Sequence, residues 1–223
     1  RLEPLTVLEG DDLTFTFQFN PAAGLQMLFM YLGNVNIGII KMIIETENVI
    51  RIEIYHPSSG WKTQDVAIVR DGVTWTFISW RIRGSDGYWS ITKNEEQMFS
   101  GVQNSPKPNT YDAVDHQMGS RAAHHVQYHG SIDDFRIYRS FLSDEQVAAV
   151  RAGGPASTCA APVDFSCDTG LVMHYAFDDP ANPGIDSVSG STAGVTGTVT
   201  IQDNAYAEFD AATSASVRMQ PFT

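Results

Sequence analysis

Glu45 and Glu47 are the best-placed pair of carboxylates in the sequence for acid and base catalysis. They lie in a strand-like stretch, where side chains alternate, so we expect both on one face. Two carboxylates on one face are the machinery of glycoside hydrolysis. Because Lys41 and Arg51 flank the pair, two solvated carboxylates are the simpler interpretation. The sequence also contains no Gly-x-Ser-x-Gly nucleophile motif, so we predict that the protein is not an enzyme.

Histidines form a second cluster with possible chemistry. His124, His125 and His129 have the spacing of ligands on a helix, but they precede Gly130 in a loop-like or strand-like segment. No acidic residue or cysteine occurs within residues 116–132 around them. Since transition metals need a fuller set of ligands, we do not expect a transition-metal site here.

Oxygen donors offer a better basis for a cation site. Carboxylates occur at Asp133, Asp134, Asp179 and Asp186, and calcium prefers carboxylate and carbonyl oxygens. The alternative is that these aspartates hydrogen-bond their own backbone in turns, as aspartate commonly does. Calcium is therefore the one cofactor to consider, with turn formation as the other interpretation.

Aromatic side chains around a turn suggest sugar binding. Tyr55, His56 and Trp61 surround the turn-forming residues 57–60, and we expect them to lie in a loop. An exposed ring presents a flat apolar face with a polar edge, which suits the face of a sugar. The alternative is a small hydrophobic cluster packed beneath the loop.

Composition limits the possible partners. The 223 residues are 43% hydrophobic and 11% aromatic, enough to bury a core. A formal charge of −12 makes nucleic acid and anionic membrane surfaces poor partners. Polar residues interrupt the most apolar stretch, residues 24–44, so no membrane insertion is expected.

The only two cysteines, Cys159 and Cys167, lie in a segment rich in proline, alanine and serine. We interpret them as one short disulfide, which places the protein in an oxidising, extracellular compartment. Two unpaired thiols in a reducing compartment are the alternative.

The elements that must position these groups are mostly strands. Alternating apolar and polar residues predict strands over residues 13–19, 27–32, 37–44, 50–54, 66–70, 75–82, 88–91, 132–138, 171–177, 195–201, 205–209 and 216–219. Residues 83–87 predict a hairpin turn. Ser143 and Gln146 form a capping box at the start of one short helix, which ends near Gly153. Together they predict an all-β, antiparallel jelly-roll sandwich with one short surface helix.

Residues 130–139 and 141–147 closely resemble the closing strand and helix of laminin G-like, concanavalin A-like jelly-roll domains. Residues 170–179, 186–190 and 207–210 resemble the opening of the same domain. The resemblance implies that residues 1–153 form the main part of a jelly roll, 154–169 a cysteine-containing linker, and 170–223 opening strands in permuted order. It also implies one calcium ion near the opening and closing strands.

The opening strands need partners, because a sandwich strand cannot leave its edge and apolar face exposed. They complete the same domain, a neighbouring protomer by strand exchange, or the next repeat of an array. The first six and last six residues are similar, which favours head-to-tail continuation. We therefore predict a non-catalytic extracellular structural or adhesive protein, with copies of itself or adjacent repeats as partners. A carbohydrate-binding module of a larger secreted protein, with glycans as partners, is the alternative.

Overall fold

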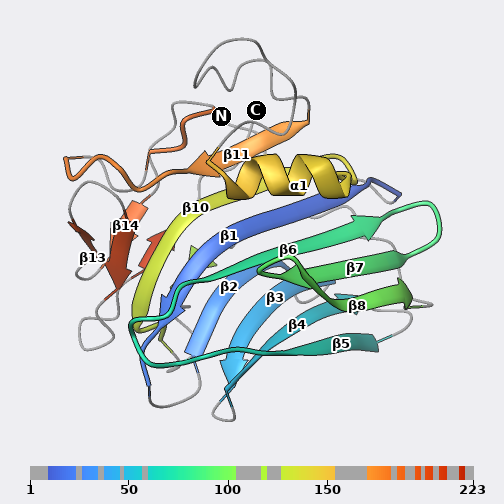
Figure 1. Ribbon diagram of the computed structural model, residues 1–223, viewed down its shortest axis with the longest axis horizontal. Helices are drawn as coiled ribbons and strands as arrows, with labels where there is room; N and C mark the ends of the chain where they lie inside the picture. Colours follow the sequence, from blue (N-terminus) through green and yellow to red (C-terminus); the bar gives the residue numbers. More distant parts are fainter. Residues whose placement is uncertain are drawn as a thin grey trace.

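The apolar and polar alternation produces strands along most of the described chain, and these build two antiparallel sheets that enclose one core (Figure 1). The computed structural model describes residues 10–23, 27–34, 38–45, 48–56, 60–103, 117–119, 127–153, 170–181, 185–188, 194–196, 199–202, 206–209 and 216–218. The predicted all-β antiparallel sandwich with one short helix is confirmed.

The first sheet has eight strands in the described residues and runs β13-β14-β10-β1-β6-β7-β8, with β11 also paired to β10. Its members are β1 (Leu13–Pro21), β6 (Thr76–Arg83), β7 (Tyr88–Lys93), β8 (Glu96–Val102), β10 (Gly130–Tyr138), β11 (Leu171–Tyr175), β13 (Val199–Gln202) and β14 (Tyr206–Phe209). The second sheet, of seven strands, runs β12-β15-β9-β2-β3-β4-β5. It contains β2 (Met27–Asn34), β3 (Gly38–Glu45), β4 (Val49–His56), β5 (Gly60–Ala67), β9 (Gln117–Met118), β12 (Gly194–Thr196) and β15 (Ser216–Arg218).

The core lies between the sheets, where inward-facing aromatic rings meet. Phe17 of β1 faces Phe29 of β2 across the sandwich, with ring centroids 4.6 Å apart. Phe15 stacks on Trp80, which contacts Trp89 edge to face. All five rings are essentially inaccessible to solvent. Aromatic pairs of this kind add to the stabilisation from burial, so the two sheets are tightly fixed to each other.

The predicted hairpin is confirmed as β6 and β7, with Arg83 opposite Tyr88. Its turn also touches a distant part of the chain. A Cβ atom at Gly84 would lie 2.2 Å from the carbonyl oxygen of Gly10, and the Gly84 N–H donates to the Asp12 carboxylate. Glycine is therefore required at this position by close backbone contact.

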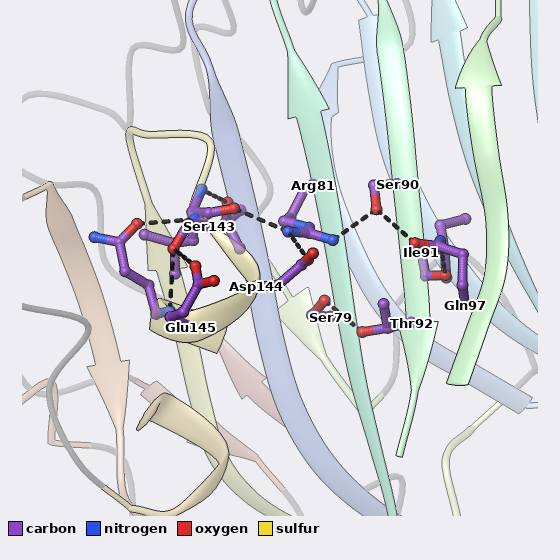
Figure 2. A network of polar contacts seen from close by, with 12 residues as sticks. Ser79, Arg81, Ser90, Ile91, Thr92, Gln97, Ser143, Asp144 and Glu145 are labelled. Carbon is purple, nitrogen blue, oxygen red and sulfur yellow. Dashed lines mark hydrogen bonds and ion pairs between the residues drawn. The ribbon is translucent and has the colours of Figure 1, made fainter. Parts of the chain in front are cut away.

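Helix α1 (Asp144–Arg151) lies over the eight-stranded sheet (Figure 1), and both hydrogen bonds of the predicted capping box are present. Below it, Arg81 donates to the carbonyl of Leu142 and to the hydroxyl of Ser90. Arg81 also pairs with Asp144 at 2.6 Å. Figure 2 shows this network running from the start of the helix across β6 to β7 and β8, so a buried cation ties the helix to the sheet.

The strands after residue 170 pair with strands before residue 153 of the same chain. β10 is the junction: β1 occupies one of its edges, while β11 and β14 share the other. In the second sheet, β15 pairs with β9, and β12 pairs with β15. The C-terminal strands thus complete both sheets without a second copy of the chain.

Two strand predictions differ from the structure by more than a shift of one or two residues at an end. The strand expected over 66–70 is wrong beyond Ala67, because pairing with β4 sets β5 at Gly60–Ala67 and the chain then leaves the sheet. The single strand expected over 195–201 is two strands, β12 and β13, which belong to different sheets. β8 was not predicted, since its outward side chains are mostly polar and exposed.

The linker with Cys159 and Cys167 lies outside the described residues, so the disulfide stays a prediction. Residues 1–9 and 219–223 also lie outside them, so the head-to-tail continuation inferred from the similar termini stays a prediction as well. Within the described part of the chain, no helix has the length and hydropathy needed to cross a bilayer.

Candidate functional site

An aromatic pair lies on the outer surface of the seven-stranded sheet, on β4 and β5. Tyr55 and Trp61 are directly opposite each other in the register, and their ring centroids are 5.1 Å apart with the planes at 46°. Trp61 is 44% exposed, the only tryptophan among the large exposed hydrophobic side chains of the described residues. These residues were expected in a loop, but they lie on strands because the β4–β5 pairing continues to the pair of His56 and Gly60.

Polar groups stand directly beside this pair. The Lys41 ammonium lies 4.2 Å from the Trp61 ring centroid and 2.7 Å from Glu53 Oε2. The Thr63 hydroxyl lies 3.3 Å from Glu53 Oε1 and donates to it. Lys41, Glu53 and Thr63 are matched across β3, β4 and β5, so strand register alone brings them together. We call Lys41, Glu53, Tyr55, Trp61 and Thr63 the β3–β5 face.

One arginine extends the same surface. Arg51 forms two hydrogen bonds with Asp65, at 2.8 and 3.0 Å, and a third with Glu45 at 2.9 Å. The hydrogen bond to Asp65 raises the pKa of Arg51, and the guanidinium in turn lowers the pKa of Asp65. Glu45 of the considered catalytic pair is thus held in an ion pair, while Glu47 lies outside the described residues.

The arrangement has the chemistry of a sugar-binding surface. A half-exposed indole offers an apolar face, and a cation beside it contributes a cation–π contact. Carboxylate, ammonium and hydroxyl groups supply acceptors and donors for sugar hydroxyls. Sequence reasoning identified Tyr55 and Trp61, and it missed Lys41 and Glu53 as their companions. The side chain of His56 lies outside the described residues.

The aspartates considered for calcium lie elsewhere, at the junction of β10 and β11. Asp134 sits in a bulge of β10 with φ 49°, where Phe17 of β1 faces two residues. Its carboxylate accepts two hydrogen bonds from Arg136, at 2.7 and 2.9 Å, and one from His174 Nε2 at 2.7 Å. Burial alone would raise the pKa of Asp134, but His174 and Arg136 outweigh it and lower that pKa.

His174 carries this network into the C-terminal segment. Its Nδ1 lies 2.8 Å from the Ser187 hydroxyl, and its backbone N–H donates to Asp186 Oδ1 at 2.9 Å. Since ionised Asp134 can only accept, Nε2 carries the hydrogen and Nδ1 is the acceptor when the ring is neutral. His174 was not identified from the sequence as part of a polar network. The available signal was its position in the otherwise apolar strand of residues 171–175. The network links segments far apart in sequence and contains no exposed aromatic surface.

The other carboxylates here have separate roles. Asp179 accepts from the backbone N–H of Ala181, as in the turn interpretation. Burial, followed by the charges of Asp134 and Asp178, raises the pKa of Asp133 to about 7. No group of three or more histidine, cysteine, aspartate or glutamate residues in the described ranges is arranged to hold a metal ion. Calcium binding stays a prediction of the resemblance.

Of the considered histidine cluster, His124 and His125 lie outside the described residues. His129 is exposed, and its carbonyl accepts from the Ala22 backbone N–H. His129, the described member of the cluster, is not part of the β3–β5 face.

No family model matches the sequence, and no curated protein matches it either. Solved structures match by fold. A heptameric SAP-like pentraxin from Limulus polyphemus is 16% identical, with a TM-score of 0.51 over 75% of this chain and 81% of the pentraxin. The CBM40 of a Ruminococcus gnavus sialidase, in complex with α2,3-sialyllactose, is 15% identical, with a TM-score of 0.53 over 66% of this chain and 96% of that one.

A candidate carbohydrate-binding protein from Bacteroides ovatus is 10% identical, with a TM-score of 0.53 over 99% of this chain and 57% of that one. At such identities these likenesses show the fold alone. They support a concanavalin A-like jelly roll at the coarse level, whereas the finer resemblance to laminin G-like domains has no matching family model.

Proposed function

We propose that this chain is a non-catalytic carbohydrate-binding domain whose β3–β5 face takes a glycan. The observation that carries the proposal is the exposed Trp61, packed against Tyr55 and bordered by Lys41 and Glu53. Apolar rings with a few convergent polar groups are the usual make-up of a ligand site. Structures with the same fold include a sialidase module in complex with sialyllactose, which supports glycans as the partner class.

The proposal replaces head-to-tail assembly as the preferred function. Assembly by strand exchange has less support, because the strands after residue 170 find their partners within the same chain. A glycan-binding domain is most useful outside the cell, so we also propose a secreted or surface location, as part of a larger extracellular protein. Catalysis is not part of the proposal, since Glu45 is held in an ion pair with Arg51.

The test is calorimetric titration of the wild-type chain with glycans found to bind on an array, followed by variants. Trp61→Ala should abolish measurable binding while the near-ultraviolet circular dichroism of the buried aromatic core persists. Tyr88→Ala is the matched control, because Tyr88 also lies beneath a cation, with the Arg83 guanidinium 4.7 Å away, but on the eight-stranded sheet. Loss of binding in Tyr88→Ala and not in Trp61→Ala would move the site to the other sheet.

A further inference from the structure

The charges on and around the β3–β5 face are paired in a way that limits its ligand. Lys41 pairs with Glu53, and Arg51 pairs with both Asp65 and Glu45. These five side chains therefore comprise two cations and three carboxylates, a net charge of −1. Neither cation is left without a counter-ion.

An acidic sugar would either compete with these carboxylates for a cation or add its own negative charge beside them. Glu53 is only 9% exposed, so removing Lys41 from it would leave a nearly buried carboxylate without its counter-ion. Breaking one side of a buried pair is strongly unfavourable. The formal charge of −12 on the whole chain adds a repulsive field for anions.

An uncharged sugar meets no such obstacle. The Trp61 ring can pack against the C–H face of a pyranose or furanose. Lys41 can donate to its hydroxyls while it remains paired with Glu53, and Thr63 adds a hydroxyl. An uncharged sugar can therefore bind without breaking the ion pairs of the face.

On the basis of the proposed function, we propose that the β3–β5 face binds uncharged oligosaccharides of hexoses or pentoses and discriminates against sugars that carry carboxylate or sulfate groups. Sialyllactose in the similar sialidase module does not transfer to this chain, because that likeness shows the fold alone.

The experiment compares neutral and acidic probes by calorimetry at low ionic strength. Neutral probes are oligosaccharides of glucose, galactose, xylose and arabinose, and acidic probes are α2,3-sialyllactose and oligogalacturonate. We expect at least one neutral probe to bind, and the acidic probes to bind at least about tenfold more weakly. Trp61→Ala should abolish the binding of the neutral probe.

A matched pair of variants tests the electrostatic cause. Asp65→Asn removes one partner of Arg51 beside the face, and Asp86→Asn removes the partner of Arg83, an equivalent two-bond pair on the other sheet. Both change the net charge equally. Asp65→Asn should improve binding of acidic probes at least about threefold, whereas Asp86→Asn should not.

Two results would overturn the inference, and only the second would also overturn the proposed function. Acidic probes that bind as tightly as neutral ones, with loss in Trp61→Ala, would refute the charge discrimination and leave the carbohydrate-binding function standing. Absence of binding to every probe, or binding unaffected by Trp61→Ala, would refute the proposed function and the inference with it.

Discussion

His174 Nε2 lies 2.7 Å from Asp134 Oδ1, and this hydrogen bond joins β11, in the C-terminal segment, to the bulge of β10. Both residues are at least nine-tenths buried. Hydrogen bonds to a buried ionised group are stronger than neutral ones, so the pair contributes to holding the C-terminal segment in the sheet.

We expect His174→Ala to lower the free energy of unfolding by about 2–3 kcal/mol, because it removes a partner from the buried Asp134 carboxylate. Urea denaturation followed by tryptophan fluorescence measures the loss. His129→Ala is the control: this histidine is exposed, and its replacement should change stability by no more than about 0.5 kcal/mol. Equal losses in the two variants would contradict a special role for His174.

Asp133 should make the protein less stable as the pH rises. Its pKa in the folded state is about 7, above the usual value of 3.8, so ionisation is harder in the folded than in the unfolded chain. Stability is lost as the pH rises from about 4 to about 7. Asp133→Asn should therefore raise the melting temperature more at pH 8 than at pH 4.5, as measured by scanning calorimetry in EDTA.

The control for this pH dependence is Asp71, whose pKa is held at about 2 by hydrogen bonds, first from the backbone of Thr74. The pKa of Asp71 is shifted in the opposite direction to that of Asp133, so ionised Asp71 favours the folded state. Asp71→Asn should therefore not raise the melting temperature at pH 8. A gain in both variants would point to general charge repulsion instead.

Arg81 and Asp144 should contribute unequally to stability although they form one ion pair. Arg81→Met leaves the Leu142 carbonyl and the Ser90 hydroxyl without their buried donor, so we expect a loss of about 2–4 kcal/mol. Asp144 has a side chain that is 83% exposed, and Asp144→Asn should cost less than about 1 kcal/mol. Urea denaturation of both variants gives the comparison, and similar losses would refute this account.

Gly84→Ala should lower stability by about 1–3 kcal/mol, because the new Cβ would lie 2.2 Å from the backbone of Gly10 and the backbone would have to move. Gly101→Ala is matched, since its Cβ would make only an ordinary 3.5 Å contact with the Phe99 ring. Thermal denaturation should leave the melting temperature of Gly101→Ala near that of the wild type. A smaller loss for Gly84→Ala than for Gly101→Ala would mean that the close approach is not present in solution.

Light scattering coupled to size-exclusion chromatography should give a mass near 24.5 kDa, because the C-terminal strands pair within their own chain. A concentration-dependent series of larger species would instead restore strand exchange between copies.

The sequence was informative wherever local patterns determine structure. Alternation in residues 13–19 predicts a half-buried strand, and the capping box at Ser143 predicts the start of a helix, because both depend on near neighbours. β5 was misplaced since its outward residues, Trp61, Thr63 and Asp65, show little apolar alternation, and only pairing with β4 makes it a strand. Its position depends on tertiary contacts.

The candidate site was predictable only in part for the same reason. Tyr55 and Trp61 are six residues apart and flank residue types that favour a turn, so their proximity could be predicted from the sequence. Lys41 comes from β3, and its place beside Trp61 depends on the registers of two strand pairs. The bond between Asp134 and His174 spans 40 residues, and no local pattern specifies such a contact.

The shared edge of β10 has a consequence for biosynthesis. One edge of this strand pairs with β1, and the other pairs with β11 and β14. β11 begins more than thirty residues after the end of β10, and β14 begins more than sixty residues after it, so both leave the ribosome later. During translation the nascent sandwich therefore presents an open strand edge and part of its apolar interior. The need for chaperones during synthesis should accordingly be greatest after β10 has emerged and before β11 and β14 have emerged.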